Sequence, residues 1–247
     1  MDANPVNIYE YEDIAKGKLG QGEYDFIAGA ATDEITLRRT RAVFDSILLR
    51  PRMMVDISQR DLRTTVLGQD IRFPIMLDPA GNHAAAHPDG ELASARAAGA
   101  VGTLLVLSAQ SSRTLEEVAQ TALGPLWFQQ YFFKERSLTL DMARRAEEAG
   151  YSALCLTLDA KVKPKRERNM RNNYTGPASP NYAHLDVTGS PWSFGLDGPT
   201  GATTCGTRPP PGRTWTGWRP TPACPWWSRA SWWVRTAGRP PTTAPAA

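Results

Sequence analysis

Four otherwise apolar stretches of the chain end in polar side chains, and these side chains are the first candidates for chemistry. The stretches are FPIMLDP (residues 73–79), GTLLVLSA (102–109), LWFQQY (126–131) and ALCLTLDA (153–160). Their polar ends carry Asp78, Ser108, Gln129, Tyr131, Thr157 and Asp159. Hydroxyl, amide and carboxylate groups can hold a polar ligand by hydrogen bonds. A simpler interpretation, that such a group meets only solvent or loop backbone, stays open for each residue taken alone.

The same stretches alternate with segments of helical pattern, and this alternation indicates the fold. Helices are expected at residues 88–100, 114–123 and 137–150, because Pro88 suits a first helical turn, Thr114 with Glu117 resembles a capping box, and Gly150 suits a helix end. Short apolar strands alternating with helices predict an α/β protein with a parallel sheet. Four such units amount to half of a (β/α)8 TIM barrel, in which chemistry lies at the C-terminal strand ends.

The composition changes near residue 195. From Gly198 to Ala247 there is no Asp, Glu, Lys, Leu or Ile, while six of the eight tryptophans and half of the twenty prolines lie there. Because proline interrupts helices and the usual core residues are missing, we expect a partial barrel over residues 1–195 and a disordered Pro/Trp/Arg-rich tail over residues 196–247. We interpret the tail as the product of a changed reading frame, which gene resequencing tests; a natural biased segment that binds a partner is the alternative.

Several classes of protein are not expected from the composition. Cys155, Cys205 and Cys224 are widely spaced and form no CxxC pair, so we expect neither a disulfide framework nor a metal site. The first twenty residues carry charges throughout, which predicts no signal peptide, no membrane span and a cytoplasmic location. Stacking and charge would allow the tail to bind nucleic acid. The frame interpretation explains the same residues, so no nucleic-acid partner is expected.

Seven short motifs, in order, resemble those of the FMN-dependent 2-hydroxy-acid oxidases and dehydrogenases, a family that includes glycolate oxidase and lactate oxidase. They are YDFIAGA (24–30), TL followed by AVF (36–44), LLRPR (48–52), AHPDGE (86–91), WFQQY (127–131), LTLDA (156–160) and KRERN (165–169). The similarity covers the N-terminal half of such a protein. It implies FMN as cofactor, a small L-2-hydroxy acid as substrate, oxygen or a quinone as electron acceptor, and homo-oligomers for the intact relatives.

The resemblance also implies that the flavin lies across the strand ends, with fixed donors and acceptors orienting its ring. Gln129 and Thr157 match positions that hydrogen-bond the pyrimidine part. Two positions depart from the family pattern: Ala109 replaces a common serine, and Asp78 replaces an apolar residue, where a carboxylate would disfavour an anionic reduced flavin unless paired or protonated. The implied cofactor contacts are Pro79, Ala80, Gly81, Ser108, Ala109, Gln129 and Thr157.

Three residues match substrate-binding positions of the family. Arg166 matches an arginine that grips the substrate carboxylate, since a planar guanidinium can make two parallel hydrogen bonds to it. A solvated arginine in a basic loop is the alternative. Tyr131 matches a residue near the substrate hydroxyl or carboxylate. Phe26 replaces a tyrosine, which removes one hydrogen bond typically worth about 0.5–1.5 kcal/mol net.

The remaining catalytic residues implied by the resemblance belong to the later half of the family. There a histidine removes a proton, a second arginine and a lysine stabilise charge, and loops bind the phosphate. His83, His87 and His184 are the only histidines here, and none matches the base, so we assign none. The 247-residue polypeptide is therefore expected to be inactive, and the open edges of a half-barrel predict poor solubility.

Two other functions stay open on the sequence alone. A half-barrel could serve as a pseudoenzyme or assembly partner, which requires that it folds and pairs with another half. A different TIM-barrel enzyme, such as a phosphate-binding isomerase or synthase, is the third possibility. The set Gln129, Tyr131, Thr157 and Arg166 argues against it, because such enzymes have no common reason to share these residues.

Overall fold

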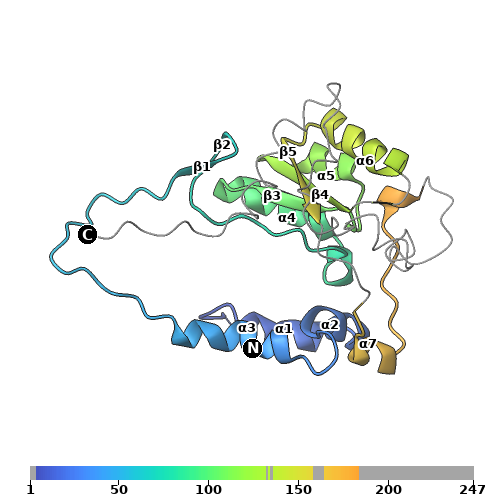
Figure 1. Cartoon of the computed structure of the whole chain (residues 1–247), viewed down its shortest axis with the longest axis horizontal. Coiled ribbons are helices and arrows are strands. Elements are labelled where there is room, and N and C mark those ends of the chain that lie inside the picture. The colour runs from blue at the N-terminus through green and yellow to red at the C-terminus, as the bar shows by residue number, and fades with distance from the viewer. Residues whose placement is uncertain (1–3, 132, 134–135, 158–163, 184–247) are drawn as a thin grey trace, which may run out of the picture.

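The computed structural model describes residues 4–131, 133, 136–157 and 164–183, which form a helical part and an α/β part (Figure 1). The helical part contains α1 (Glu10–Lys18), α2 (Gln21–Ala28), α3 (Ile35–Ala42) and the 3-10 turn η1 (Val43–Ser46). The short helix α7 (Glu167–Arg171), which comes much later in the sequence, packs beside α2. The segment around α7 therefore connects the two parts.

A parallel sheet of three strands forms the centre of the α/β part. Its order is β3 (Leu105–Ser108), β4 (Leu126–Tyr131) and β5 (Ala153–Thr157). The helices α4 (Gly90–Val101), α5 (Leu115–Thr121) and α6 (Arg136–Glu148) alternate with the strands, as the sequence predicts. The fold is the N-terminal half of a (β/α)8 barrel.

The first expected strand, at residues 73–79, is only partly confirmed. Leu77 makes a single parallel bridge to Leu105, and the rest of the segment is irregular. Proline carries no backbone N–H, so Pro74 and Pro79 cannot donate to a ladder. The Ile75 amide instead donates to the Phe73 carbonyl at 2.9 Å. The segment therefore borders the sheet without joining it as a full strand.

The helix boundaries mostly follow the predicted signals. Thr114 Oγ1 accepts from the Glu117 amide at 3.2 Å and Glu117 Oε2 accepts from the Thr114 amide at 2.9 Å, so the capping box is confirmed. Gly150 follows α6 with φ +89°, a left-handed conformation that favours glycine. The expectation that Pro88 lies in the first helical turn was wrong, because α4 begins at Gly90 and Pro88 lies in the preceding loop.

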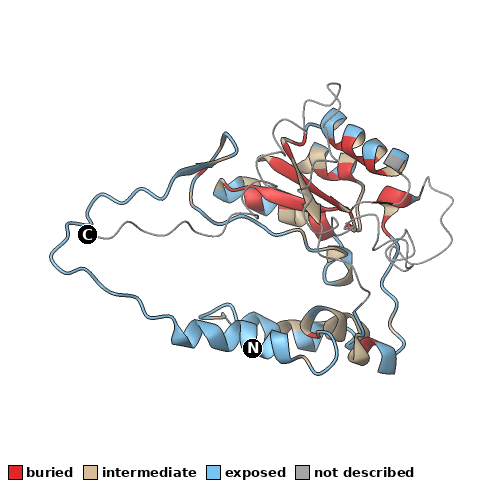
Figure 2. Cartoon of the chain, in the orientation of Figure 1, coloured by how far each residue is buried: buried red, intermediate tan, exposed pale blue. Residues whose placement is uncertain are grey.

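Both faces of the sheet are buried, which explains why its strands read as continuous apolar runs. On the outer face, Leu105, Leu107 and Phe128 pack against the helices. On the inner face, Val106 and Trp127 pack with side chains of the hairpin formed by β1 (Thr64–Val66) and β2 (Gln69–Ile71). Figure 2 shows the buried residues concentrated in this part, while α1 to α3 are largely exposed.

The turns η2 (His83–Ala85) and η3 (Pro180–Tyr182) complete the described elements. Within η3, the buried Asn181 accepts from the Leu115 amide at 2.9 Å, so this distant segment returns to the start of α5. Among the described residues, no helix has the length and apolar character needed to cross a lipid bilayer. The predicted tail at residues 196–247 lies outside the described residues.

Candidate functional site

Strand register brings the predicted polar residues to one edge of the sheet. In the pairing of β3, β4 and β5, Ser108 lies opposite Gln129, and Tyr131 lies opposite Thr157. Parallel strands end at the same edge, so these side chains share the C-terminal rim where barrel enzymes place their sites. These four residues therefore lie together at the strand ends, and their role in binding stays a prediction.

A chain of hydrogen bonds fixes the Gln129 amide at this edge. Its Oε1 accepts from Ser108 Oγ at 3.2 Å and from the Ala109 amide at 3.3 Å, while its Nε2 donates to Thr157 Oγ1 at 2.7 Å. Ser108 and Gln129 are buried, and Thr157 is half-buried. This row of alternating hydroxyl and amide groups is pre-organised, because each member is held by its neighbour.

The loop that follows Leu77 lies against the end of β3. The Asn82 amide donates to the Gln110 carbonyl at 3.1 Å. A Cβ on Gly81 would stand only 2.9 Å from Gln110 Cβ, so glycine permits this close approach. Gly81 is thereby placed beside Gln110, two positions after Ser108, and the implied contact of Pro79, Ala80 and Gly81 with a flavin stays a prediction.

Glu91 holds these two loops together and was not singled out from the sequence. Its side chain is fully buried at the start of α4. One oxygen, Oε1, accepts from the His83 amide at 3.0 Å and from the Ser112 amide at 2.9 Å, and Oε2 accepts from Ser112 Oγ at 2.5 Å. The only sequence signal was its place in AHPDGE, where it resembles an ordinary first-turn acidic residue.

Phe26 and Arg166 meet although 140 positions separate them in the sequence. The guanidinium carbon of Arg166 lies 4.7 Å from the centroid of the Phe26 ring, and Nη2 donates to the Gly29 carbonyl at 3.0 Å. Arg166 precedes α7 and is half-buried, and this burial lowers the pKa of its guanidinium. An arginine stays protonated nonetheless, so it presents a partly desolvated positive charge.

The strand arrows of β4 and β5 point toward the side of the molecule that holds α2 and α7 (Figure 1). The elements that carry Phe26 and Arg166, namely α2 and the start of α7, thus lie on the same side of the fold as the C-terminal rim. Two further predicted candidates differ in outcome: Asp78 is exposed in the loop beside the sheet, and Asp159 lies outside the described residues.

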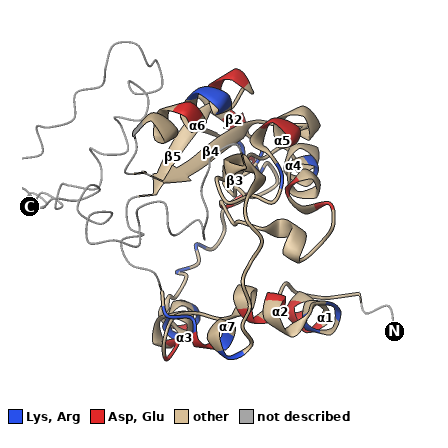
Figure 3. Cartoon of the chain, turned by 90° about the vertical axis from the view of Figure 1, so that its right-hand side faces the viewer, with Lys and Arg blue, Asp and Glu red and all other residues tan. Residues whose placement is uncertain are grey.

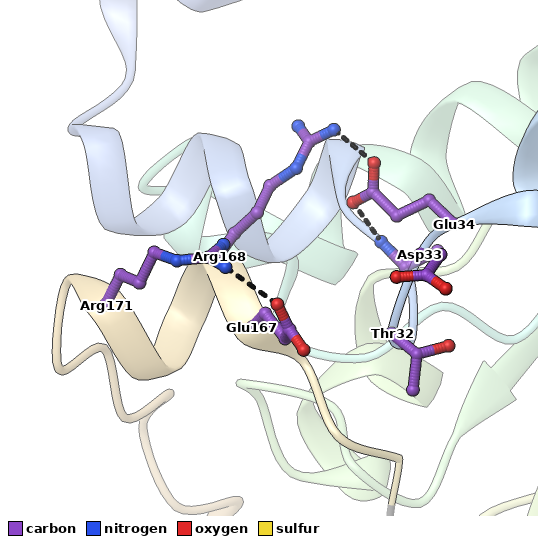
Figure 4. Close-up of a pocket in the computed structure, with 7 residues that line it drawn as sticks. Thr32, Asp33, Glu34, Glu167, Arg168 and Arg171 are labelled. Carbon is purple, nitrogen blue, oxygen red and sulfur yellow. Dashed lines mark hydrogen bonds and ion pairs between the residues drawn. The ribbon is translucent and has the colours of Figure 1, made fainter.

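A small cavity of about 140 Å³ lies between the loop before α3 and helix α7 (Figure 4). It is lined by Ala30, Thr32, Asp33, Glu34, Glu167, Arg168 and Arg171. Arg168 Nη2 lies 2.5 Å from Glu34 Oε2, and Arg171 Nη2 lies 2.7 Å from Glu167 Oε2. The cavity is therefore lined by paired charges and does not contain the strand-end row.

Comparison with known proteins decides the family. The sequence profile described as FMN-dependent dehydrogenase matches residues 15–205. The chain belongs to this family. It is 47% identical over 187 residues to an L-lactate oxidase of Nostoc sp., which covers 74% of this chain and 51% of that protein. It is 44% identical over 185 residues to glycolate oxidase 3 of Arabidopsis thaliana, covering 74% of this chain and 50% of that protein.

Solved structures confirm the fold. A soluble mutant of the membrane-associated (S)-mandelate dehydrogenase from Pseudomonas putida aligns with a TM-score of 0.71 and 34% identity, covering 75% of this chain and 54% of that one. A mandelate oxidase aligns with a TM-score of 0.69 and 30% identity, covering 78% and 58%. The chain therefore spans about half the length of the FMN-dependent dehydrogenases that it matches.

The strand-end residues fit the flavin of this family. The pyrimidine edge of a flavin presents both donors and acceptors, which a protein meets with groups of both kinds. Gln129 carries one of each, and the hydroxyls of Ser108 and Thr157 can donate or accept. Asn82 Oδ1, next to Gly81, is buried without a hydrogen-bond partner among the described residues, so a bound polar group could satisfy it.

Proposed function

We propose that this chain belongs to an enzyme that oxidises an L-2-hydroxy acid to a 2-oxo acid with FMN. The observation that supports the proposal most is the row of Ser108, Gln129 and Thr157 at the strand ends of an FMN-dependent dehydrogenase. Bound FMN would supply the two-electron acceptor for the substrate. The names of the relatives, lactate and glycolate oxidases, support the class of substrate.

The residues of this chain would bind and orient both molecules. Gln129 and Thr157 would hold the pyrimidine edge, and the backbone of residues 79–81 would face the ring. The Arg166 guanidinium would bind the substrate carboxylate, because its charge is partly desolvated. Phe26 would contribute an apolar wall in place of a hydroxyl, and Tyr131 at the end of β4 would approach the substrate hydroxyl or carboxylate.

Oxidation of the substrate needs a base that removes a proton. In our proposal, none of the residues of this polypeptide is that base. The His83 ring lies 3.0 Å from Ser94 Oγ, and His87 Nδ1 accepts from the Asp89 amide at 3.2 Å, so both rings bond within the loop and helix that follow residue 82. His184 lies outside the described residues. We therefore propose that the 247-residue polypeptide alone does not turn over substrate. We propose oxygen or a quinone as the electron acceptor, and a cytoplasmic location.

A second candidate function is that of an assembly partner, in which this half-barrel pairs with another half. Exposed apolar side chains at the open border of the sheet favour it: Ile75 is 65% exposed, beside Met76 and Leu77. Size-exclusion chromatography of the purified chain distinguishes the outcomes. A discrete dimer supports pairing, and aggregate in the void volume contradicts it.

Replacing Gln129 by Leu tests the flavin site. The host is a chimera in which residues 1–183 of this chain precede the remaining part of the Nostoc L-lactate oxidase. The substitution removes the amide and leaves Ser108 and Thr157 without their partner. Leaving a buried polar group without a hydrogen bond costs about 1–3 kcal/mol. We expect FMN to bind about 10–100-fold more weakly, measured by flavin fluorescence titration of the apoprotein.

The matched control is Gln120→Leu, the same substitution at an exposed position of α5. It is expected to leave FMN affinity unchanged. Equal affinities for the Gln129 variant and the control would show that the strand-end row does not hold the flavin.

A further inference from the structure

We propose that Glu34 is a positioning residue for Arg166, acting through Arg168 and the loop of residues 29–34. The inference rests on the proposed function, in which Arg166 binds the substrate carboxylate. Among the described residues, the Arg166 guanidinium contacts the Phe26 ring and the Gly29 carbonyl, both at the end of α2. The direction of the guanidinium therefore depends on how the end of α2 is held against the segment that carries Arg166.

The Glu34 carboxylate joins these two segments. Its Oε1 accepts from the Ala30 amide at 3.0 Å, and its Oε2 accepts from Arg168 Nη2 at 2.5 Å. Ala30 directly follows Gly29, and Arg168 lies two positions after Arg166. The Glu34 side chain is 16% exposed and the Arg168 side chain 38% exposed, so the ion pair is partly shielded from water. Figure 4 shows the carboxylate between the Arg168 side chain and the loop.

The backbone of the loop supports the same role. Thr32 and Glu34 have φ values of +47° and +54°, which non-glycine residues rarely adopt and which persist where surrounding contacts hold them. The Thr32 amide donates to the Lys165 carbonyl at 2.8 Å, which fixes the residue before Arg166. A Cβ on Gly29 would lie 2.5 Å from the Asp25 carbonyl oxygen and 3.2 Å from Arg168 Cδ, so the segments are in close contact.

A second link runs parallel to the first. Asn172 Nδ2 donates to Asp25 Oδ2 at 3.0 Å, and Arg168 Nη1 lies 3.9 Å from Asp25 Oδ1. Figure 3 shows acidic and basic positions on the ribbons of α2, α3 and α7, whereas the strands β3, β4 and β5 contain no charged residue. Glu167 differs, because its partners Lys165 and Arg171 belong to its own segment. The pair of Glu167 and Arg171 therefore joins nothing across the contact and provides a control.

The experiment records the side-chain Nε–Hε signal of Arg166 in ¹⁵N-labelled full-length chain by NMR, with the signal assigned by its loss in Arg166→Lys. Because the guanidinium lies over the Phe26 ring, the ring current displaces this signal, and Phe26→Leu should abolish the displacement. We expect Glu34→Gln and Arg168→Met each to remove most of the displacement. Arg168→Lys keeps a donor for Glu34 and should restore much of it, while Arg171→Met should leave it unchanged.

An Arg166 signal that keeps its position in Glu34→Gln and Arg168→Met, with the backbone amide spectrum intact, would overturn the inference. If either variant loses its folded spectrum, the other substitutions decide, since loss of the displacement in Arg168→Lys or in Arg171→Met is also contrary to the inference. Titration of the chimera with oxalate separates the two proposals. An Arg166 signal that depends on Glu34 but does not respond to oxalate there contradicts only the proposed function.

Discussion

Glu91→Ala is expected to lower the free energy of unfolding by about 3–5 kcal/mol, the largest effect on stability that we predict. The carboxylate is fully buried and accepts three hydrogen bonds, from the His83 amide and from the amide and hydroxyl of Ser112. Removing it leaves buried donors without an acceptor and opens a cavity. Urea denaturation followed by circular dichroism measures the change.

Glu148→Ala is the control, because Glu148 is exposed at the end of α6. A surface substitution of this kind is expected to change stability by less than about 0.5 kcal/mol. If the two variants unfold at the same urea concentration, Glu91 does not link the loops after residue 77 and after β3.

Arg166→Met is expected to lower kcat/KM for a 2-hydroxy acid by about 100-fold in the chimera with the Nostoc L-lactate oxidase. Two charge-assisted hydrogen bonds to a carboxylate, at about 1.5–3 kcal/mol each, would be lost, and part of this loss would be recovered by water. Methionine keeps the apolar contact with Phe26. Steady-state kinetics with L-lactate and with glycolate measure the effect.

Arg171→Met serves as the comparison for this prediction. Its side chain is 72% exposed and pairs with Glu167 one helical turn away, so it should change kcat/KM little. If Arg166→Met retains the unsubstituted kcat/KM, Arg166 is a solvated residue of a basic loop, as the alternative interpretation of the sequence has it.

The strand-end row could be predicted from the sequence because it follows from local pattern. Ser108, Gln129 and Thr157 each end an apolar run, and parallel strands in register must bring such ends together. The capping box of Thr114 and Glu117 was likewise predictable, since both partners lie within one helical turn. In these places local spacing and the three-dimensional arrangement carry the same information.

Long-range contacts could not be read from the pattern. The Arg166 guanidinium bonds to Gly29, 137 positions away, and only packing of α7 beside α2 creates that contact. Glu91 was missed because its spacing is that of a solvent-facing helix start, whereas in the structure two loops fold over it. The stretch at residues 73–79 shows the opposite error. Its apolar composition predicts a full strand, but its prolines prevent one.

Turnover of L-lactate and glycolate by the purified chimera tests the central claim most directly, namely that residues 1–183 build the flavin-facing half of a 2-hydroxy-acid oxidising site. We expect a yellow protein that produces the 2-oxo acid from at least one of the two substrates, while the 247-residue polypeptide alone produces none. A folded chimera that binds FMN and oxidises neither substrate, or turnover by the 247-residue polypeptide alone, would contradict it.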